Sequence, residues 1–230
     1  MSERAPDAPP SSALEDIFHG YEREIRVKNY RTCVWLTIIF MLAGSSLDWI
    51  VYGKAGAIRF LPLRIISVAV LAAGGALLLT RLGARIHRVL GVAMAVPLIA
   101  SISMMIALTE GAESPYYAGL NLVLLGAAIL MRWPLTDSII VVGLTLACYL
   151  AACLWHGPIR NWHIFYNNLY FLVVTGFLTT AGTWVYNRIR FSEFQSRHDL
   201  DITRKQLEAA NSKLEENNRQ LLELDEAKSR

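Results

Sequence analysis

An aspartate and an arginine stand inside apolar stretches, where charged side chains are costly. Asp48 lies near the end of the apolar run 32–52, and Arg64 lies about one turn into the next run, 60–80. Ionisable residues within a membrane span usually face the helix bundle or a cavity, which makes them candidates for function. If the two runs form a tight helical hairpin, the two side chains can pair. Three interpretations stay open: a structural pair, two side chains that reach to the membrane surface, or a ligand site.

Two further polar patches lie near the expected outer ends of later apolar runs. Their members are Tyr116, Tyr117, Asn121, Tyr166, Asn167 and Asn168. Tyr117 and Asn121 are four residues apart and therefore share a helical face. Amides within hydrocarbon need hydrogen-bond partners, which neighbouring helices supply. The alternative is an outward-facing pocket with apolar walls, where these amides and phenols meet a small amphiphilic ligand such as a quorum signal or a quinone.

Histidines and catalytic motifs give weaker signals. His156 and His163 flank the last expected outer loop, but two imidazoles do not complete a zinc or copper site. Glu110, Glu113 or Asp48 would have to join them, so imidazoles without a metal are the expected interpretation. The sequence contains no Walker, dinucleotide-binding, nucleophile-elbow or HExxH motif. We therefore expect no catalytic residue, metal or cofactor in this chain.

Six apolar runs must position these side chains. Hydrophobic residues make up 54% of the 230 residues and gather in runs that contain almost no charge. Crossing a bilayer takes about 20 residues of helix, and the runs cover 32–52, 60–80, 89–108, 117–131, 139–155 and 165–186. Pro97 predicts a kink in the third run. The sequence therefore predicts an all-α membrane protein with a six-helix transmembrane sensor domain over 31–187.

The positive charges predict how these spans are oriented, because short cytoplasmic loops carry an excess of Lys and Arg. If the N-terminus is inside, four cations lie in the outer segments: Lys54, Arg59, Arg64 and Arg160. Ten lie inside: Arg23, Arg26, Lys28, Arg31, Arg81, Arg85, Arg88, Arg132, Arg188 and Arg190. This bias predicts that both termini are cytoplasmic, with short outer loops at 53–59, 109–116 and 156–163. The net charge is only +3, and the Lys and Arg residues lie at the membrane edges, so we interpret them as topology signals and expect no nucleic-acid partner.

The segments outside the spans differ at the two ends of the chain. Residues 1–12 are polar and rich in Pro, which predicts a disordered tail. Residues 13–30 have the apolar spacing of an amphipathic cytoplasmic helix. Residues 188–230 contain no Gly or Pro, and leucines recur there every seven residues, at Leu200, Leu207, Leu214 and Leu221. This repeat predicts a parallel coiled coil for signalling and dimerisation, and hence a homodimer.

Several segments together resemble a known family. They are 46–52 (Ser-Leu-Asp-Trp-Ile-Val-Tyr), 114–122 (Ser-Pro-Tyr-Tyr-Ala-Gly-Leu-Asn-Leu), 167–171 (Asn-Asn-Leu-Tyr-Phe) and the C-terminal Leu-Asp-Glu-Ala-Lys-Ser-Arg. They are similar to the six-transmembrane N-terminal module of bacterial sensor histidine kinases, and related modules occur on nucleotide cyclases. In such kinases a segment like 226–230 leads into Phe-Phe-Ala-Asn-x-Ser-His-Glu, whose His is phosphorylated.

This resemblance implies the membrane sensor and dimerisation module of a two-component histidine kinase in the bacterial inner membrane. A signal would pass through the sixth span and the coiled coil to a kinase core beyond Arg230. That core would use ATP and magnesium and serve a response regulator. The alternative is the same module on a nucleotide cyclase that makes cAMP or c-di-GMP. A transporter is less favoured, because the intramembrane charges are few. The expected partners of this chain are a second copy, the lipid bilayer and a small amphiphilic ligand.

Overall fold

The chain is helical throughout the residues that the structure describes. The computed structural model describes residues 11–80, 83, 86–131 and 133–228, and the side chains at 25, 29–80, 83, 86–131 and 133–220. No strand occurs within these ranges, which confirms the predicted all-α class. Residues 1–10 of the predicted tail, the cations Arg81, Arg85 and Arg132, and the side chain of Leu221 lie outside the described part.

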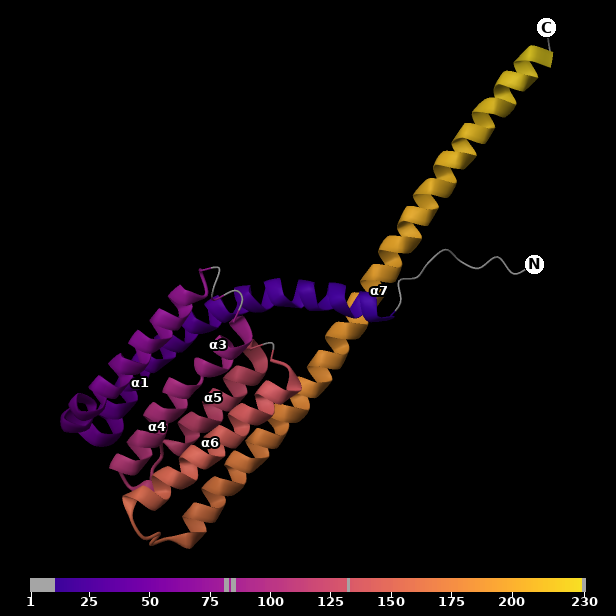
Figure 1. Cartoon of the computed structure of the whole chain (residues 1–230). Coiled ribbons are helices and arrows are strands. Elements are labelled where there is room, and N and C mark those ends of the chain that lie inside the picture. The colour runs from indigo at the N-terminus through magenta and orange to yellow at the C-terminus, as the bar shows by residue number, and fades with distance from the viewer. Residues whose placement is uncertain (1–10, 81–82, 84–85, 132, 229–230) are drawn as a thin grey trace. The chain divides into compact units, whose positions relative to one another are not determined.

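Helix α1 (Ser11–Leu77) turns back on itself at Gly53 (Figure 1). Gly53 has φ 69° and ψ −169°, a conformation that residues with a Cβ rarely adopt. Its two arms, 11–52 and 54–77, are antiparallel, because Arg64 of the second arm contacts Met41 and Asp48 of the first. We expected a loop over 53–59, but the helix resumes directly after the glycine. The helix also begins within the predicted tail and runs unbroken through the predicted amphipathic segment into the first span.

The third predicted span consists of two helices, α3 (His87–Ala93) and α4 (Val96–Leu108). Pro97 lies in the first turn of α4, where a missing N–H costs no intrahelical hydrogen bond. The expected kink is therefore a break between two helices. Helix α4 packs against α1, α3, α5 and α6, and its residues Ile99, Met105 and Ile106 are fully buried. It forms the centre of the bundle.

The remaining helices follow the predicted spans. The 3-10 helix η1 (Gly111–Glu113) precedes α5 (Tyr117–Leu130), which is followed by α6 (Leu135–His156). Helix α7 (Trp162–Lys228) contains both the sixth predicted span and the heptad leucines. The predicted link between the last span and the coiled-coil segment is therefore a continuous helix.

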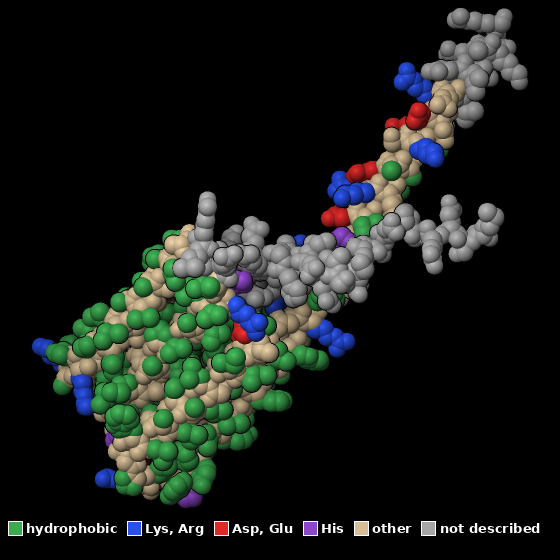
Figure 2. Space-filling view, in the orientation of Figure 1, with side chains coloured by type: hydrophobic (Ala, Val, Ile, Leu, Met, Phe, Trp, Pro, Cys, Tyr) green, Lys and Arg blue, Asp and Glu red, His purple; other side chains and the backbone are tan. Residues whose placement is uncertain are grey.

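Several described helices have the length and composition to cross a membrane. Within the described residues four segments qualify: Asn29–Leu77, His87–Leu108, Leu135–His156 and Trp162–Gln220, while α5 is a shorter apolar helix. The first of them holds 49 residues and includes the turn at Gly53, so two predicted spans fall within it. Hydrophobic side chains cover the face of the bundle that Figure 2 shows. An apolar surface of this extent is typical of a protein that contacts lipid.

The chain divides into two compact units, residues 1–187 and 188–230. Most described side chains of the second unit are exposed. The heptad leucines Leu200, Leu207 and Leu214 are between 58% and 69% exposed. In the part of this unit that is described, a single copy therefore leaves its leucine stripe open to solvent.

Candidate functional site

A buried ion pair joins the two arms of α1 near the turn at Gly53. Nε of Arg64 lies 2.6 Å from Oδ2 of Asp48, and Nη2 lies 2.7 Å from Oδ1. Nη1 of Arg64 also donates to the carbonyl oxygen of Met41 at 3.0 Å. Gly44 permits this approach, because a Cβ there would collide with the guanidinium. Asp48 is 0% exposed and Arg64 6%. Such a two-point contact fixes the relative position of the two arms.

Aromatic rings cover this ion pair. The hydroxyl of Tyr116 donates to Oδ1 of Asp48 at 2.6 Å. The Tyr116 ring stacks on Tyr52 at a centroid distance of 5.6 Å, and it meets Phe60 edge-on at the same distance. The carboxylate of Asp48 thus accepts three hydrogen bonds, two from Arg64 and one from Tyr116. The structure brings these three predicted site residues into one internal network whose charges are already satisfied.

The segment that joins α4 to α5 is held by two other helices. Nδ2 of Asn168, in α7, donates to the carbonyl oxygen of Ala112 at 3.0 Å. Nδ1 of His156, in α6, lies 3.1 Å from the carbonyl oxygen of Ala107. Asn167 points its amide to Oδ1 of Asn168 at 3.3 Å. Asn168 of the second predicted polar patch therefore contacts the same segment that carries Tyr116.

The other predicted site residues lie apart from this network. Tyr166 and His163 are exposed, and Tyr117 and Asn121 are half-buried. Oδ1 of Asn121 is buried and has no hydrogen-bond partner in the described structure. No group of three His, Cys, Asp or Glu side chains that could hold a metal occurs among the described residues. His156 contacts a backbone carbonyl instead.

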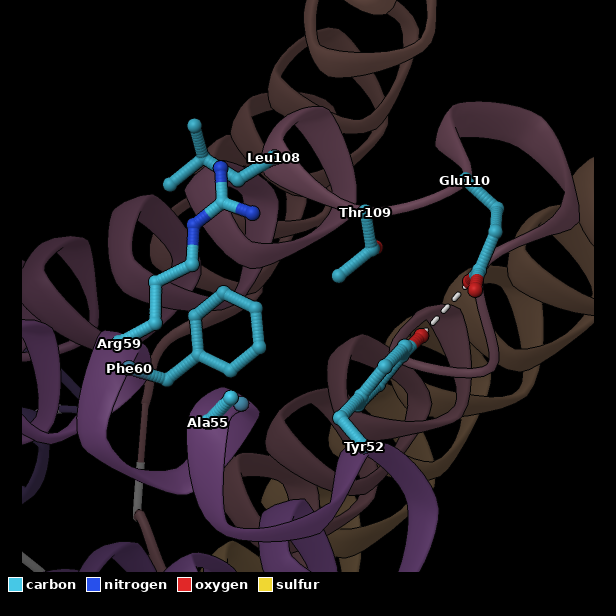
Figure 3. A pocket seen from close by; sticks show the side chains of 8 residues that line it. Tyr52, Ala55, Arg59, Phe60, Leu108, Thr109 and Glu110 are labelled. Atoms are coloured by element: carbon cyan, nitrogen blue, oxygen red, sulfur yellow. Dashed lines mark hydrogen bonds between the residues drawn. The ribbon is translucent and has the colours of Figure 1, made fainter.

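A pocket that the sequence did not predict lies beside the aromatic cover. Tyr52 donates its hydroxyl to Oε2 of Glu110 at 2.6 Å (Figure 3). The pocket next to this bond has a volume of about 310 Å³ and is lined by Tyr52, Ala55, Gly56, Arg59, Phe60, Leu108, Thr109 and Glu110. Tyr52 and Glu110 are 58 residues apart in the sequence. Only the turn at Gly53 and the packing of α1 on α4 bring the two ends of the pocket together.

A second ion pair was also missed, near the start of α6. Nη2 of Arg88 lies 2.8 Å from Oδ1 of Asp137, and Nε lies 3.0 Å from both carboxylate oxygens. Nη2 also donates to Oγ1 of Thr136 at 2.7 Å. Asp137 is buried in the first turn of α6, where the helix dipole favours a carboxylate. The sequence signal for this ion pair is the position of Asp137 just before the apolar run 139–155. His156, at the other end of α6, contacts Ala107 beside the segment that carries Tyr116. The ion pair of Arg88 and Asp137 and the ion pair of Arg64 and Asp48 therefore lie toward opposite ends of the bundle.

Comparison with known proteins gives one match. The sequence model of the MASE8 family, a family of membrane-associated sensor domains, matches residues 46–201. This range includes Asp48, Arg64, the pocket and the first turns of the heptad segment. No curated protein and no solved structure matches the chain. Since the match covers more than half of the sequence, the chain belongs to the MASE8 family of membrane-associated sensor domains.

Proposed function

We propose that the chain is the membrane sensor and dimerisation module of a two-component sensor histidine kinase. Six spans would cross the bacterial inner membrane and leave both termini in the cytoplasm. A stimulus near the Gly53 turn would shift the segment 109–116, and α7 would carry the change to a kinase core beyond Arg230. Membership of a sensor family supports the first half of this proposal. The resemblance of the C-terminal segment 224–230 supports the second half.

The observation that carries the proposal is the hydrogen bond from Asn168 to the carbonyl oxygen of Ala112. Asn168 lies on the helix that also bears the exposed heptad leucines. A rotation or displacement of a continuous helix reaches both of its ends, and packed interfaces switch between discrete arrangements. A second copy of the chain would cover the leucines and give the helix a partner to move against.

The nature of the output is tested by reading the gene beyond the codon for Arg230 and assaying the encoded protein. We expect a sequence like Phe-Phe-Ala-Asn-x-Ser-His-Glu and autophosphorylation of its His with ATP and magnesium. The phosphoryl group would then pass to a response regulator. A cyclase domain at this point would contradict the kinase and keep the membrane module. A stop codon would contradict both outputs.

A further inference from the structure

The pocket beside Tyr52 contains two charged side chains with unused bonding capacity. Throughout the described part, Arg59 makes no hydrogen bond and no ion pair, and its Cζ lies 5.9 Å from the centroid of the Phe60 ring. Glu110 uses Oε2 to accept the hydroxyl of Tyr52, whereas Oε1 has no hydrogen-bond partner among the residues that the structure describes. Figure 3 shows the guanidinium of Arg59 and the carboxylate of Glu110 on opposite sides of the pocket, which Leu108 also lines.

The opposite charges of Arg59 and Glu110 disfavour the binding of ions that carry only one sign of charge in this pocket. Arg59 and Glu110 line one pocket without forming an ion pair. An anion alone would be attracted by Arg59 and repelled by Glu110, and the reverse holds for a cation. A ligand that carries both charges satisfies both side chains. The volume of about 310 Å³ suits a small head group, and Phe60 and Leu108 provide apolar walls for an attached chain.

We propose that this pocket binds the head group of a zwitterionic amphiphile. Its phosphate or carboxylate contacts the guanidinium of Arg59, which presents several donors to such a group. Its ammonium contacts Oε1 of Glu110, and its aliphatic part lies on Phe60 and Leu108. The ligand is either a bilayer phospholipid or a free molecule with the same head-group chemistry. This inference rests on the proposed sensor function and names its ligand class.

The pocket is coupled to the ion-pair network through one side chain. Tyr52 bonds to Glu110 on the pocket side and stacks on Tyr116 on the other. An ammonium at Oε1 of Glu110 shares this carboxylate with the Tyr52 hydroxyl, which is bound at Oε2, and Glu110 itself belongs to the segment 109–116. Occupancy therefore acts on the segment 109–116, which also contacts Asn168 of α7.

Calorimetric titration of the purified chain in micelles tests the proposal with three probes. Dihexanoylphosphatidylethanolamine carries ammonium and phosphate, dihexanoylphosphatidylglycerol carries phosphate alone, and phosphoethanolamine is the head group without chains. We expect R59Q and E110Q each to weaken binding of the ethanolamine lipid about tenfold or more, as the loss of a charged hydrogen-bond partner predicts. E110Q keeps a carbonyl acceptor for Tyr52, so its fold is expected to remain intact. R59K is expected to recover part of the affinity.

Two matched variants serve as controls. R160Q and E113Q remove exposed charges that do not line the pocket, and both are expected to bind as the wild type does. Binding of phosphoethanolamine equal to that of the lipid would identify a free ligand. Binding of the lipid alone would identify the bilayer as the source. Both results support the zwitterion site.

Other outcomes would overturn it. The proposed zwitterionic ligand is contradicted if neither the ethanolamine lipid nor phosphoethanolamine binds. It is also contradicted if R59Q and E110Q both bind the ethanolamine lipid as the wild type does, or if the glycerol lipid binds more tightly. These measurements need no output domain. A negative result therefore leaves the sensor proposal standing, and that proposal fails instead if the gene or the oligomeric state contradicts it.

Discussion

Asp48 and Arg64 neutralise each other inside an apolar bundle, and this determines the effect of a substitution at either residue. Asp48→Asn leaves the buried guanidinium without its counter-charge. Breaking one partner of a buried pair typically costs 3–5 kcal/mol. We expect the variant to lower the free energy of unfolding by about 3 kcal/mol, measured by denaturant titration in micelles.

The double variant D48N/R64L removes the stranded charge and is expected to recover much of this loss. Glu113→Gln is the control, because Glu113 is exposed and makes no ion pair among the described residues. An unfolding curve of D48N that overlays the wild type would show that the pair does not hold the two arms together.

Gly44 offers a steric test of the same contact. A Cβ at this position would collide with the Arg64 guanidinium, which is fixed by Asp48 and Met41. Overpacking of this kind costs about 1–3 kcal/mol. For a chain of this size, Gly44→Ala should lower the melting temperature by about 2–4 °C per kcal/mol. Gly126→Ala is the matched control, because a Cβ there meets nothing within 4 Å. Equal melting temperatures of the two variants would contradict a rigid contact.

At the scale of elements, the bond between α7 and the segment 109–116 is the feature to test. Asn168→Leu leaves the buried carbonyl of Ala112 without its donor, which costs about 1–3 kcal/mol. We expect faster amide hydrogen exchange in 109–116 and an altered response of the full-length protein to its stimulus. Asn167→Leu is the comparison variant, because it removes the exposed amide that donates to Oδ1 of Asn168 and keeps the Asn168 amide that donates to Ala112.

Equal exchange in the two asparagine variants would remove the proposed link between this segment and α7. Faster exchange with an unchanged response would keep the contact and reject its role in signalling. Amide exchange around the ion pair between Arg88 and Asp137 serves as a reference, because this pair lies at the start of α6, away from the segment 109–116. Exchange there is expected to be the same in both variants.

At the scale of the whole molecule, the exposed leucine stripe predicts a homodimer. We expect twice the mass of one chain by light scattering in mild detergent, after correction for bound detergent. L207D/L214D introduces charges into the stripe and is expected to separate the two copies. A209D/S212D places the same charges elsewhere on the helix, outside the heptad leucines, and is expected to remain dimeric. A monomeric wild type would contradict the coiled coil.

The orientation in the membrane gives a second prediction at this scale. The positive-inside rule places Arg160 outside and Ser196 inside. In a background with Cys33, Cys148 and Cys153 replaced by Ala, R160C should react with a membrane-impermeant maleimide in intact cells. S196C should react only after lysis. Both positions are exposed in the structure. The opposite labelling pattern would show that the topology is inverted. Labelling of both cysteines in intact cells would place both positions outside and contradict a cytoplasmic C-terminal segment.

The sequence alone determined most of the helical and apolar segments, but not the helix over 54–59 or the division of the third span into α3 and α4. Length, apolar composition and the heptad leucines are local properties, and α5, α6 and α7 begin or end within a few residues of the predicted bounds. The predicted spans 32–52 and 60–80 lie in α1, and Pro97 marks the start of α4. The sequence also indicated Asp48 and Arg64, because a charge in an apolar run is visible without a structure.

Tertiary structure decided which side chains meet. Tyr116 contacts Asp48 across 68 residues and Tyr52 contacts Glu110 across 58. These contacts depend on the positive φ at Gly53 and on the way α1 packs against α4, and neither follows from periodicity. A helical repeat specifies which face of a segment is buried, but it does not specify which other segment buries it. The sequence therefore predicted a membrane helix bundle with a coiled-coil segment, while the packing alone created the pocket with Arg59 and Glu110 on its two sides.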